Sequence, residues 1–249
     1  MTEQFWDALR SSTRSRIGLG RVGNGLPTKA ELEFRAAHAA ARDAVHDELD
    51  VTALTGRLTA LWLGDPVVVT SRAGDRTEYL RRPDLGREPA QALDLPAHGD
   101  DLAVVLADGL SARAVEAHAV PFLEALLGVI SISVAVPVIA TQARVALGDH
   151  IGAALGVRAV LVLIGERPGL SVNDSLGVYL TYAPRPGRHD AERNCVSNIH
   201  QPDGLRYADA ARVVAGLLSA SFALGESGVR VKDRSGAVGQ ADARVLDVP

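Results

Sequence analysis

Two short segments of the 249-residue chain gather side chains that could bind a ligand or do chemistry. The first, residues 165–170, reads Gly-Glu-Arg-Pro-Gly-Leu and directly follows an apolar run. Its carboxylate, Glu166, could accept hydrogen bonds from the N–H groups of an amide-rich ligand. The alternative is an ion pair between Glu166 and Arg167 that only orders the loop, and residue types alone favour this simpler interpretation.

The second segment, residues 193–200, contains the only cysteine of the chain, Cys195, with His200 five positions further on. A thiol beside an imidazole could act as a nucleophile with its base, which would make the chain a stand-alone thiol enzyme. However, catalytic partners meet through the fold, so their spacing along the chain is poor support. The alternative is that Cys195 packs as a small apolar side chain, as lone cysteines commonly do.

The overall composition limits the classes of partner. The formal net charge is -4, from 26 basic and 30 acidic residues, so neither a nucleic-acid-binding surface nor an acidic tail is indicated. Aromatic residues make up 4% of the chain, which argues against base-stacking platforms. A single cysteine excludes an internal disulfide and a multi-cysteine zinc site, and it fits a reducing compartment. The first residues lack the basic and apolar regions of a secretory signal, so we expect a cytoplasmic protein.

One stretch has the length of a membrane-spanning helix. Residues 125–143 are uncharged and about as long as a bilayer requires. Two serines, a proline, a threonine and a glutamine interrupt the stretch, and Gly128 breaks it early. We therefore expect the end of a helix, a turn and a buried strand there, and no membrane segment.

The second half of the chain alternates apolar runs with amphipathic segments. This pattern predicts an α/β fold with a Rossmann-like, mostly parallel sheet and helices on both faces, in a domain spanning residues 101–234. The expected strands are at 102–107, 134–140, 157–164, 179–182 and 229–232, and the expected helices follow Ser111 and cover 146–155 and 207–224.

Residues 1–100 have a different pattern and are predicted to precede this domain. Polar residues 1–16 and a helix at 28–49, opened by a T-x-x-E capping box at Thr28, predict a helical arm. Residues 67–73 and 76–82, joined by Gly-Asp, predict a small β-hairpin. At the other end of the chain, residues 235–249 are expected to form a disordered tail.

The predicted sheet would place three polar loops together. In open α/β sheets, ligands bind outside the carboxyl ends of the strands. At those ends the sequence has Asp-Gly-Leu-Ser at 108–111, Gln-Ala-Arg-Val at 142–145 and the segment 165–170. A ligand site built from these loops is the clearest functional expectation from the residue pattern.

Eight motifs taken together resemble one family, the small (light) subunit of ethanolamine ammonia-lyase. They follow one another across about residues 14–234 and are IGLGRVG at 17–23, HAAARDAVH at 38–46, YLRRPDLGR at 79–87, DGLS at 108–111, RVALGD at 144–149, GERPGL at 165–170, DSLG at 174–177 and RNCVSNIH at 193–200. Each motif is short, and the order of all eight makes the resemblance specific.

The resemblance implies that the chain is not catalytic on its own. In the family, a large subunit with a TIM barrel binds ethanolamine and carries the catalytic side chains, and adenosylcobalamin lies between the two subunits. We therefore expect a hetero-oligomer that converts ethanolamine to acetaldehyde and ammonia, with residues 1–100 contacting the large subunit. The expected location is the cytoplasm, with packaging inside a bacterial microcompartment as a further option.

Three positions match the family's corrinoid-contacting residues, namely Val145, Glu166 and Cys195. The Glu166 carboxylate suits corrin amides, Val145 offers an apolar side chain and backbone groups, and Cys195 offers a backbone or thiol contact. The sequence lacks the Asp-x-His-x-x-Gly string of corrinoid proteins that replace the lower base with histidine, which fits base-on binding of adenosylcobalamin. The alternative is a structural adaptor that binds the large subunit but has lost the cofactor.

Overall fold

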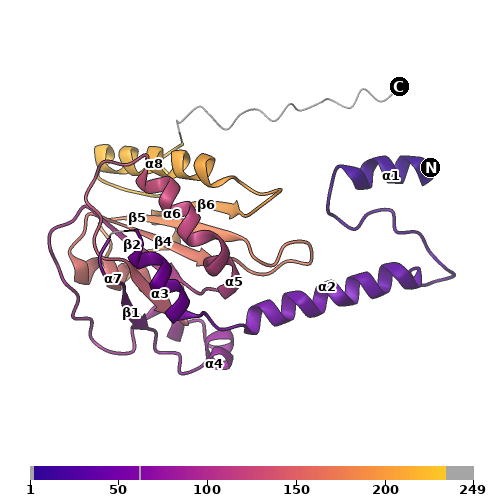
Figure 1. The fold of residues 1–249 in the computed structure, drawn as a ribbon, viewed down its shortest axis with the longest axis horizontal. Helices are drawn as coiled ribbons and strands as arrows, with labels where there is room; N and C mark the ends of the chain where they lie inside the picture. Colours follow the sequence, from indigo (N-terminus) through magenta and orange to yellow (C-terminus); the bar gives the residue numbers. More distant parts are fainter. Residues whose placement is uncertain (1–2, 62, 234–249) are drawn as a thin grey trace.

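The computed structural model describes residues 3–61 and 63–233, and its centre is a six-stranded sheet (Figure 1). The strand order is β1-β3-β2-β4-β5-β6. The strands are β1 (Val67–Thr70), β2 (Leu102–Ala107), β3 (Val138–Thr141), β4 (Ala159–Gly165), β5 (Leu176–Tyr182) and β6 (Arg193–Ile199). β2 and β4 are buried along their whole length, as their continuous apolar runs predict.

The α/β class is confirmed, but the sheet is mixed. β1, β3, β2 and β4 run parallel, whereas β5 is antiparallel to β4 and β6 is antiparallel to β5. The last two strands therefore depart from the mostly parallel, Rossmann-like sheet that we expected. The cause is the length of the connections, because residues 166–175 and 183–192 are too few for the helical crossover that joins parallel strands. The predicted edge strand at 229–232 is wrong, and β6 occupies that edge.

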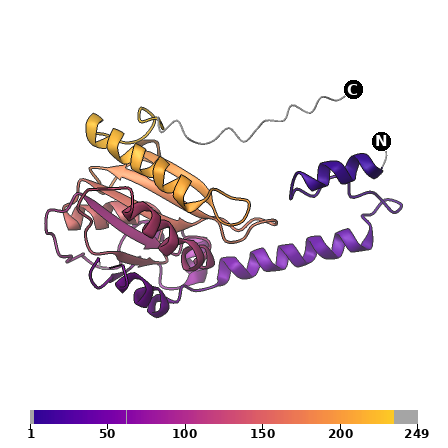
Figure 2. The ribbon, with the colours of Figure 1, turned by 45° about the horizontal axis from the view of Figure 1, so that its top comes forward.

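Helices cover both faces of the sheet (Figures 1 and 2). The first face carries α3 (Val51–Thr59), α5 (Ala112–Ala114), a π-helical turn η2 (Val115–Ala119), α6 (Val120–Leu127) and α8 (Tyr207–Leu224), and the second carries α7 (Leu147–Leu155). Side chains of β2 alternate between the two faces. Leu102 and Val104 belong to the same core cluster as α6 and α8, while Ala103 and Val105 belong to the cluster formed with α7. Burial on both faces explains why this strand is apolar throughout.

The helices α1 (Glu3–Ser11) and α2 (Thr28–His46) extend away from the sheet and form the predicted arm (Figures 1 and 2). Between them the chain passes close to an aromatic ring, because a Cβ added at Gly18 would lie 2.4 Å from the Trp6 side chain. The predicted capping box is wrong. Thr28 is already helical, and Pro27, which precedes it, provides no side-chain cap.

The predicted β-hairpin at residues 67–82 is also wrong. β1 forms but pairs with β3, and the second half is the helix α4 (Arg76–Arg81), followed by a 3-10 turn η1 (Leu85–Arg87). The Asp75 side chain caps α4 by accepting a 2.8 Å hydrogen bond from the Glu78 amide, and the Glu78 carboxylate accepts one of 2.8 Å from the Gly74 amide. Gly-Asp is therefore a helix start here, because Asp75 is the N-cap of α4 and Glu78 bonds back to the residue before it.

Residues 125–143 form the end of α6, a connection and β3, as expected. By length and composition alone α8 could cross a membrane, but core helices of soluble proteins pass the same test, and α8 packs Ala211, Val214 and Leu218 into the core. The tail predicted at 235–249 lies outside the described residues.

Candidate binding site at the strand ends

The loops after β2, β3 and β4 enclose a cavity of about 330 Å³ at the carboxyl ends of these parallel strands. Two of the three predicted site residues, Val145 and Glu166, line it. The other lining residues are Tyr79, Gly109, Leu110, Arg144, Ile164, Gly165, Arg167 and Tyr179. The cavity therefore lies where the sequence places the ligand site.

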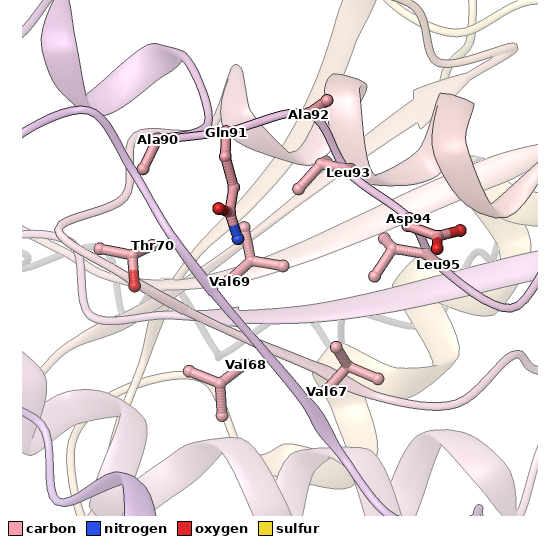
Figure 3. A pocket seen from close by; sticks show the side chains of 10 residues that line it. All are labelled: Val67, Val68, Val69, Thr70, Ala90, Gln91, Ala92, Leu93, Asp94 and Leu95. Carbon is pink, nitrogen blue, oxygen red and sulfur yellow. The ribbon is translucent and has the colours of Figure 1, made fainter.

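A smaller hollow of about 180 Å³ lies at the free edge of β1 (Figure 3). It is enclosed by β1 and residues 90–95, where the Ala90 amide donates a 2.9 Å hydrogen bond to the Thr70 carbonyl oxygen. Gln91 and Asp94 contribute the longer polar side chains. None of the predicted site residues lines this hollow, so we place the candidate site at the strand ends.

Two glycines let the loops after β2 and β4 approach each other. A Cβ added at Gly165 would lie 2.0 Å from the Ser111 carbonyl oxygen, and one added at Gly109 would lie 2.3 Å from the Gly165 carbonyl oxygen. Gly109 also has a φ of +57°, which favours glycine. The Leu110 amide donates a 2.9 Å hydrogen bond to the Gly165 carbonyl oxygen across this contact. Side chains at either glycine would separate the two loops and deform the cavity.

Asp108 connects the loop after β2 to the loop after β3. Its buried carboxylate accepts hydrogen bonds from the backbone amides of Gly109 at 2.8 Å, Gln142 at 2.8 Å and Ala143 at 2.9 Å. Arg76 of α4 lies 3.4 Å from the same carboxylate. Asp108 thus orients the loop that carries Val145, and it is a positioning residue rather than a ligand of the cavity.

Tyr79 and Arg144 form one wall of the cavity. The Arg144 guanidinium lies 4.4 Å from the centre of the Tyr79 ring, and the Tyr79 hydroxyl donates a 2.9 Å hydrogen bond to the Ala143 carbonyl oxygen. Burial raises the pKa of Tyr79 well above its usual range, so the hydroxyl remains a donor. Tyr79 lies in one of the eight sequence motifs, but its residue type and spacing indicate no role in the site. The packing shows that the motif holds Arg144 in place.

Glu166 is not paired with its neighbour Arg167 in the part of the chain that the structure describes, which contradicts the simpler interpretation of this segment. Its carboxylate instead accepts hydrogen bonds from the Ser175 hydroxyl at 2.6 Å and from the Asn198 amide at 3.4 Å. A carboxylate has about four acceptor positions, so capacity remains for a ligand in the cavity.

Cys195 lies beside the cavity rather than in its lining. It stands opposite Tyr179 in the β5–β6 pair, and the Tyr179 hydroxyl, whose pKa burial raises to about 12, hydrogen-bonds to the thiol. His200 is buried and bonds to Asn198 instead, with 3.0 Å between its Nε2 and the Asn198 Oδ1. The thiol and the imidazole therefore do not form the nucleophile–base pair that a stand-alone thiol enzyme needs.

The Cys195 thiol is expected to react slowly with iodoacetamide at pH 7. The Cys195 side chain is exposed, but partial desolvation raises the pKa of its thiol and the Tyr179 hydroxyl only partly opposes this shift, so the reactive thiolate is scarce at neutral pH and increases as the pH rises. The measurement is the alkylation rate from pH 7 to 10 beside that of glutathione. Because Tyr179→Phe removes the donor that stabilises the thiolate, this variant should react more slowly still. A wild-type rate at pH 7 above that of glutathione would contradict this account.

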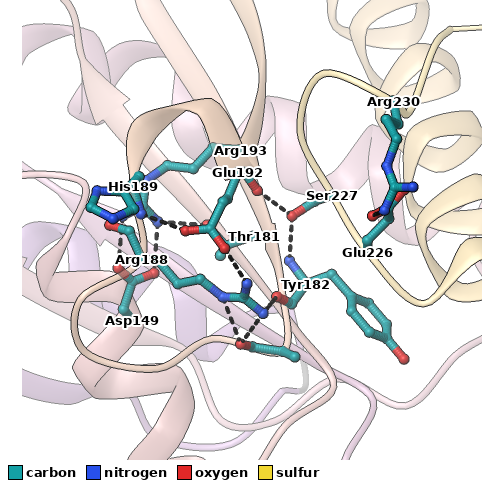
Figure 4. Close-up of polar contacts among 11 residues, drawn as sticks. Asp149, Thr181, Tyr182, Arg188, His189, Glu192, Arg193, Glu226, Ser227 and Arg230 are labelled. Carbon is teal, nitrogen blue, oxygen red and sulfur yellow. Dashed lines mark hydrogen bonds and ion pairs between the residues drawn. The ribbon is translucent and has the colours of Figure 1, made fainter.

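A buried ion pair holds β6, which carries Cys195, to α7, which follows Val145 (Figure 4). Arg193 donates to Asp149 through two hydrogen bonds of 2.6 and 2.7 Å, and both side chains are 2% exposed. Arg193 also donates to the Thr181 hydroxyl at 2.8 Å. This pair links two of the sequence motifs across β5 and fixes the distance between the Val145 loop and the Cys195 strand.

These features define an α/β protein with a cavity built from the loops at the strand ends, in which the described Cys195 and His200 do not form a nucleophile–base pair. The family model described as ethanolamine ammonia-lyase light chain matches residues 3–232. The chain belongs to this family and is an ethanolamine ammonia-lyase subunit, a member of a lyase family.

Relatives support the same assignment. A protein of Rhodococcus erythropolis named ethanolamine ammonia-lyase small subunit is 57% identical over 244 residues, covering 97% of this chain and 95% of the relative. Proteins with the same name from Bradyrhizobium diazoefficiens and Rhodopseudomonas palustris are 52% identical over 236 residues and 51% identical over 249 residues. Those alignments cover 91% and 97% of this chain, and 90% and 95% of the relatives.

Proposed function

We propose that the chain is the cofactor-holding small subunit of an adenosylcobalamin-dependent ethanolamine ammonia-lyase, which converts ethanolamine to acetaldehyde and ammonia. The observation that carries the proposal is the cavity at the strand ends, which Val145 and Glu166 line and which Cys195 adjoins through Tyr179. Bound adenosylcobalamin supplies the radical chemistry. The side chains of this subunit bind and orient, while the large subunit supplies the substrate site.

The side chains at the cavity fit a corrinoid, whose ring is apolar and whose edge carries amides. Val145, Leu110 and Ile164 provide apolar surface. Glu166 provides an acceptor for amide N–H groups, and Arg144 provides a donor for amide oxygens. The buried Nε of Arg144, a residue that lines the cavity, has no hydrogen-bond partner among the described residues. Unpaired buried polar atoms of this kind suit a ligand that completes them.

The arm supports the proposal of a large partner subunit. Helices α1 and α2 extend from the sheet, and the arm exposes the large apolar side chains Phe5, Val22, Leu26, Leu32 and Phe34. Exposed apolar groups on an extended element suit burial against another chain. We propose that the chain forms a hetero-oligomer with the large subunit. We further propose that this complex is located in the cytoplasm, where a bacterial microcompartment could enclose it.

The variant Glu166→Gln is expected to weaken corrinoid binding by the assembled complex about 10-fold to 100-fold, because it removes a charged acceptor worth about 1.5–3 kcal/mol. The measurement is a spectrophotometric titration of the complex with hydroxocobalamin. Glu124→Gln, at an exposed position on α6, is the matched control and should bind as the wild type does. Equal affinity in Glu166→Gln and the wild type would contradict the role of Glu166, and partner binding without any corrinoid affinity would favour the adaptor.

A further inference from the structure

A second hollow of about 450 Å³ adjoins the cavity, between α2 and the loops after β2, β3 and β4. Three guanidinium groups line it, from Arg42 on α2, Arg144 after β3 and Arg167 after β4. His38 lies one helical turn before Arg42 on the same lining face. The described residues that line this hollow include no carboxylate, so its positive charge is not compensated within the lining.

Two of these arginines differ from most others in the part of the chain that the structure describes. Arg76, Arg158 and Arg193 each lie within ion-pair distance of a carboxylate. Arg42 and Arg167 make no ion pair or side-chain hydrogen bond with another described residue. Guanidinium groups without carboxylate partners, gathered around one hollow, suit a bound anion.

The third guanidinium is fixed in place without an acceptor. The Arg144 guanidinium stacks on the Tyr79 ring. The Gly86 backbone packs closely against the Arg144 side chain, since a Cβ added at Gly86 would lie 3.0 Å from the Arg144 Cγ. The buried Nε of Arg144 has no hydrogen-bond partner among the described residues. A planar donor held in this way is preorganised for an oxygen of a ligand.

We propose that this hollow binds the phosphate of the cobalamin nucleotide loop, an inference that rests on the proposed function. The two hollows share Leu110, Arg144 and Arg167, so one ligand can occupy both. Adenosylcobalamin carries neutral amides around its ring and a single phosphodiester in its nucleotide loop. Glu166 suits the amides and would repel the phosphodiester, whereas the three guanidinium groups bind phosphate through charge-assisted hydrogen bonds.

The test titrates the assembled two-subunit complex with hydroxocobalamin, cobinamide phosphate and cobinamide, which lacks the phosphate. Arg42→Gln and Arg167→Gln are each expected to raise the Kd for the first two corrinoids about tenfold and to leave the Kd for cobinamide unchanged. Arg185→Gln changes an exposed arginine outside both hollows and should alter none of the three values. Added salt should weaken cobalamin binding more in the wild type than in the variants.

Three results would overturn the inference. If the arginine variants lose affinity equally for all three corrinoids, the arginines do not bind the phosphate, and the proposed function is unaffected. Weaker subunit assembly, with unchanged affinity for all three corrinoids in the complex that still forms, would show that the arginines contact the partner subunit and not the phosphate. A wild-type complex that binds none of the three corrinoids would overturn both this inference and the proposed function.

Discussion

Replacing Asp149 by alanine is expected to lower the free energy of unfolding by about 3–5 kcal/mol. The change leaves the Arg193 guanidinium buried without its carboxylate, whereas in the wild type the two side chains share a bidentate contact at 2% exposure each. Because the pair joins α7 to β6, the loss should also loosen the strand that carries Cys195. The measurement is urea unfolding followed by circular dichroism.

Asp190 provides the matched control for this prediction. It lies 3.4 Å from the same Arg193 guanidinium but is 80% exposed, so solvent weakens the interaction. Asp190→Ala should therefore cost no more than about 1 kcal/mol. Similar losses in the two variants would show that burial of the Asp149 pair does not determine its contribution.

Replacing Gly165 by alanine is expected to destabilise the chain by roughly 1–3 kcal/mol and to weaken corrinoid binding by the complex. The new methyl group would lie 2.0 Å from the Ser111 carbonyl oxygen and 2.7 Å from that of Asp108, and backbone atoms cannot move aside as a flexible side chain can. The loops after β2 and β4 must separate, which alters the cavity that Glu166 lines. Urea unfolding and a hydroxocobalamin titration measure the two effects.

Gly56 is the control for the effect of the substitution itself. It lies inside α3, and a Cβ added there meets nothing within 4 Å. Gly56→Ala should therefore stabilise the chain by up to about 1 kcal/mol through helix propensity. A Gly165→Ala variant as stable as the wild type would mean that the loop contact is not tight.

Sequence periodicity predicted the elements whose burial is continuous or one-sided. β2 and β4 are apolar throughout. Helix α8 begins and ends at the predicted residues, and its end is fixed by Gly225, whose φ is +74°. The hairpin prediction failed because Asp75 caps a helix, a choice that the Gly-Asp pair alone does not reveal. β6 was not predicted because its first residue, Arg193, is charged and is buried only through Asp149, 44 positions away.

The candidate site could be predicted in part, because the parallel strands that position it were themselves predicted. Parallel strands place their carboxyl ends at one edge of the sheet, so the loops that carry Val145 and Glu166 were expected to lie together, and both residues line the same cavity. The contact between Cys195 and Tyr179 depends on the register of an antiparallel pair, and the stacking of Arg144 on Tyr79 depends on α4. Neither follows from local spacing, so these contacts needed the fold.

The most direct test of the central claim is co-expression of the chain with the candidate large subunit, followed by an assay of acetaldehyde release from ethanolamine with and without adenosylcobalamin. The account predicts activity only when both chains and the cofactor are present. Activity from this chain alone without adenosylcobalamin, or failure of the two chains to associate, would contradict it.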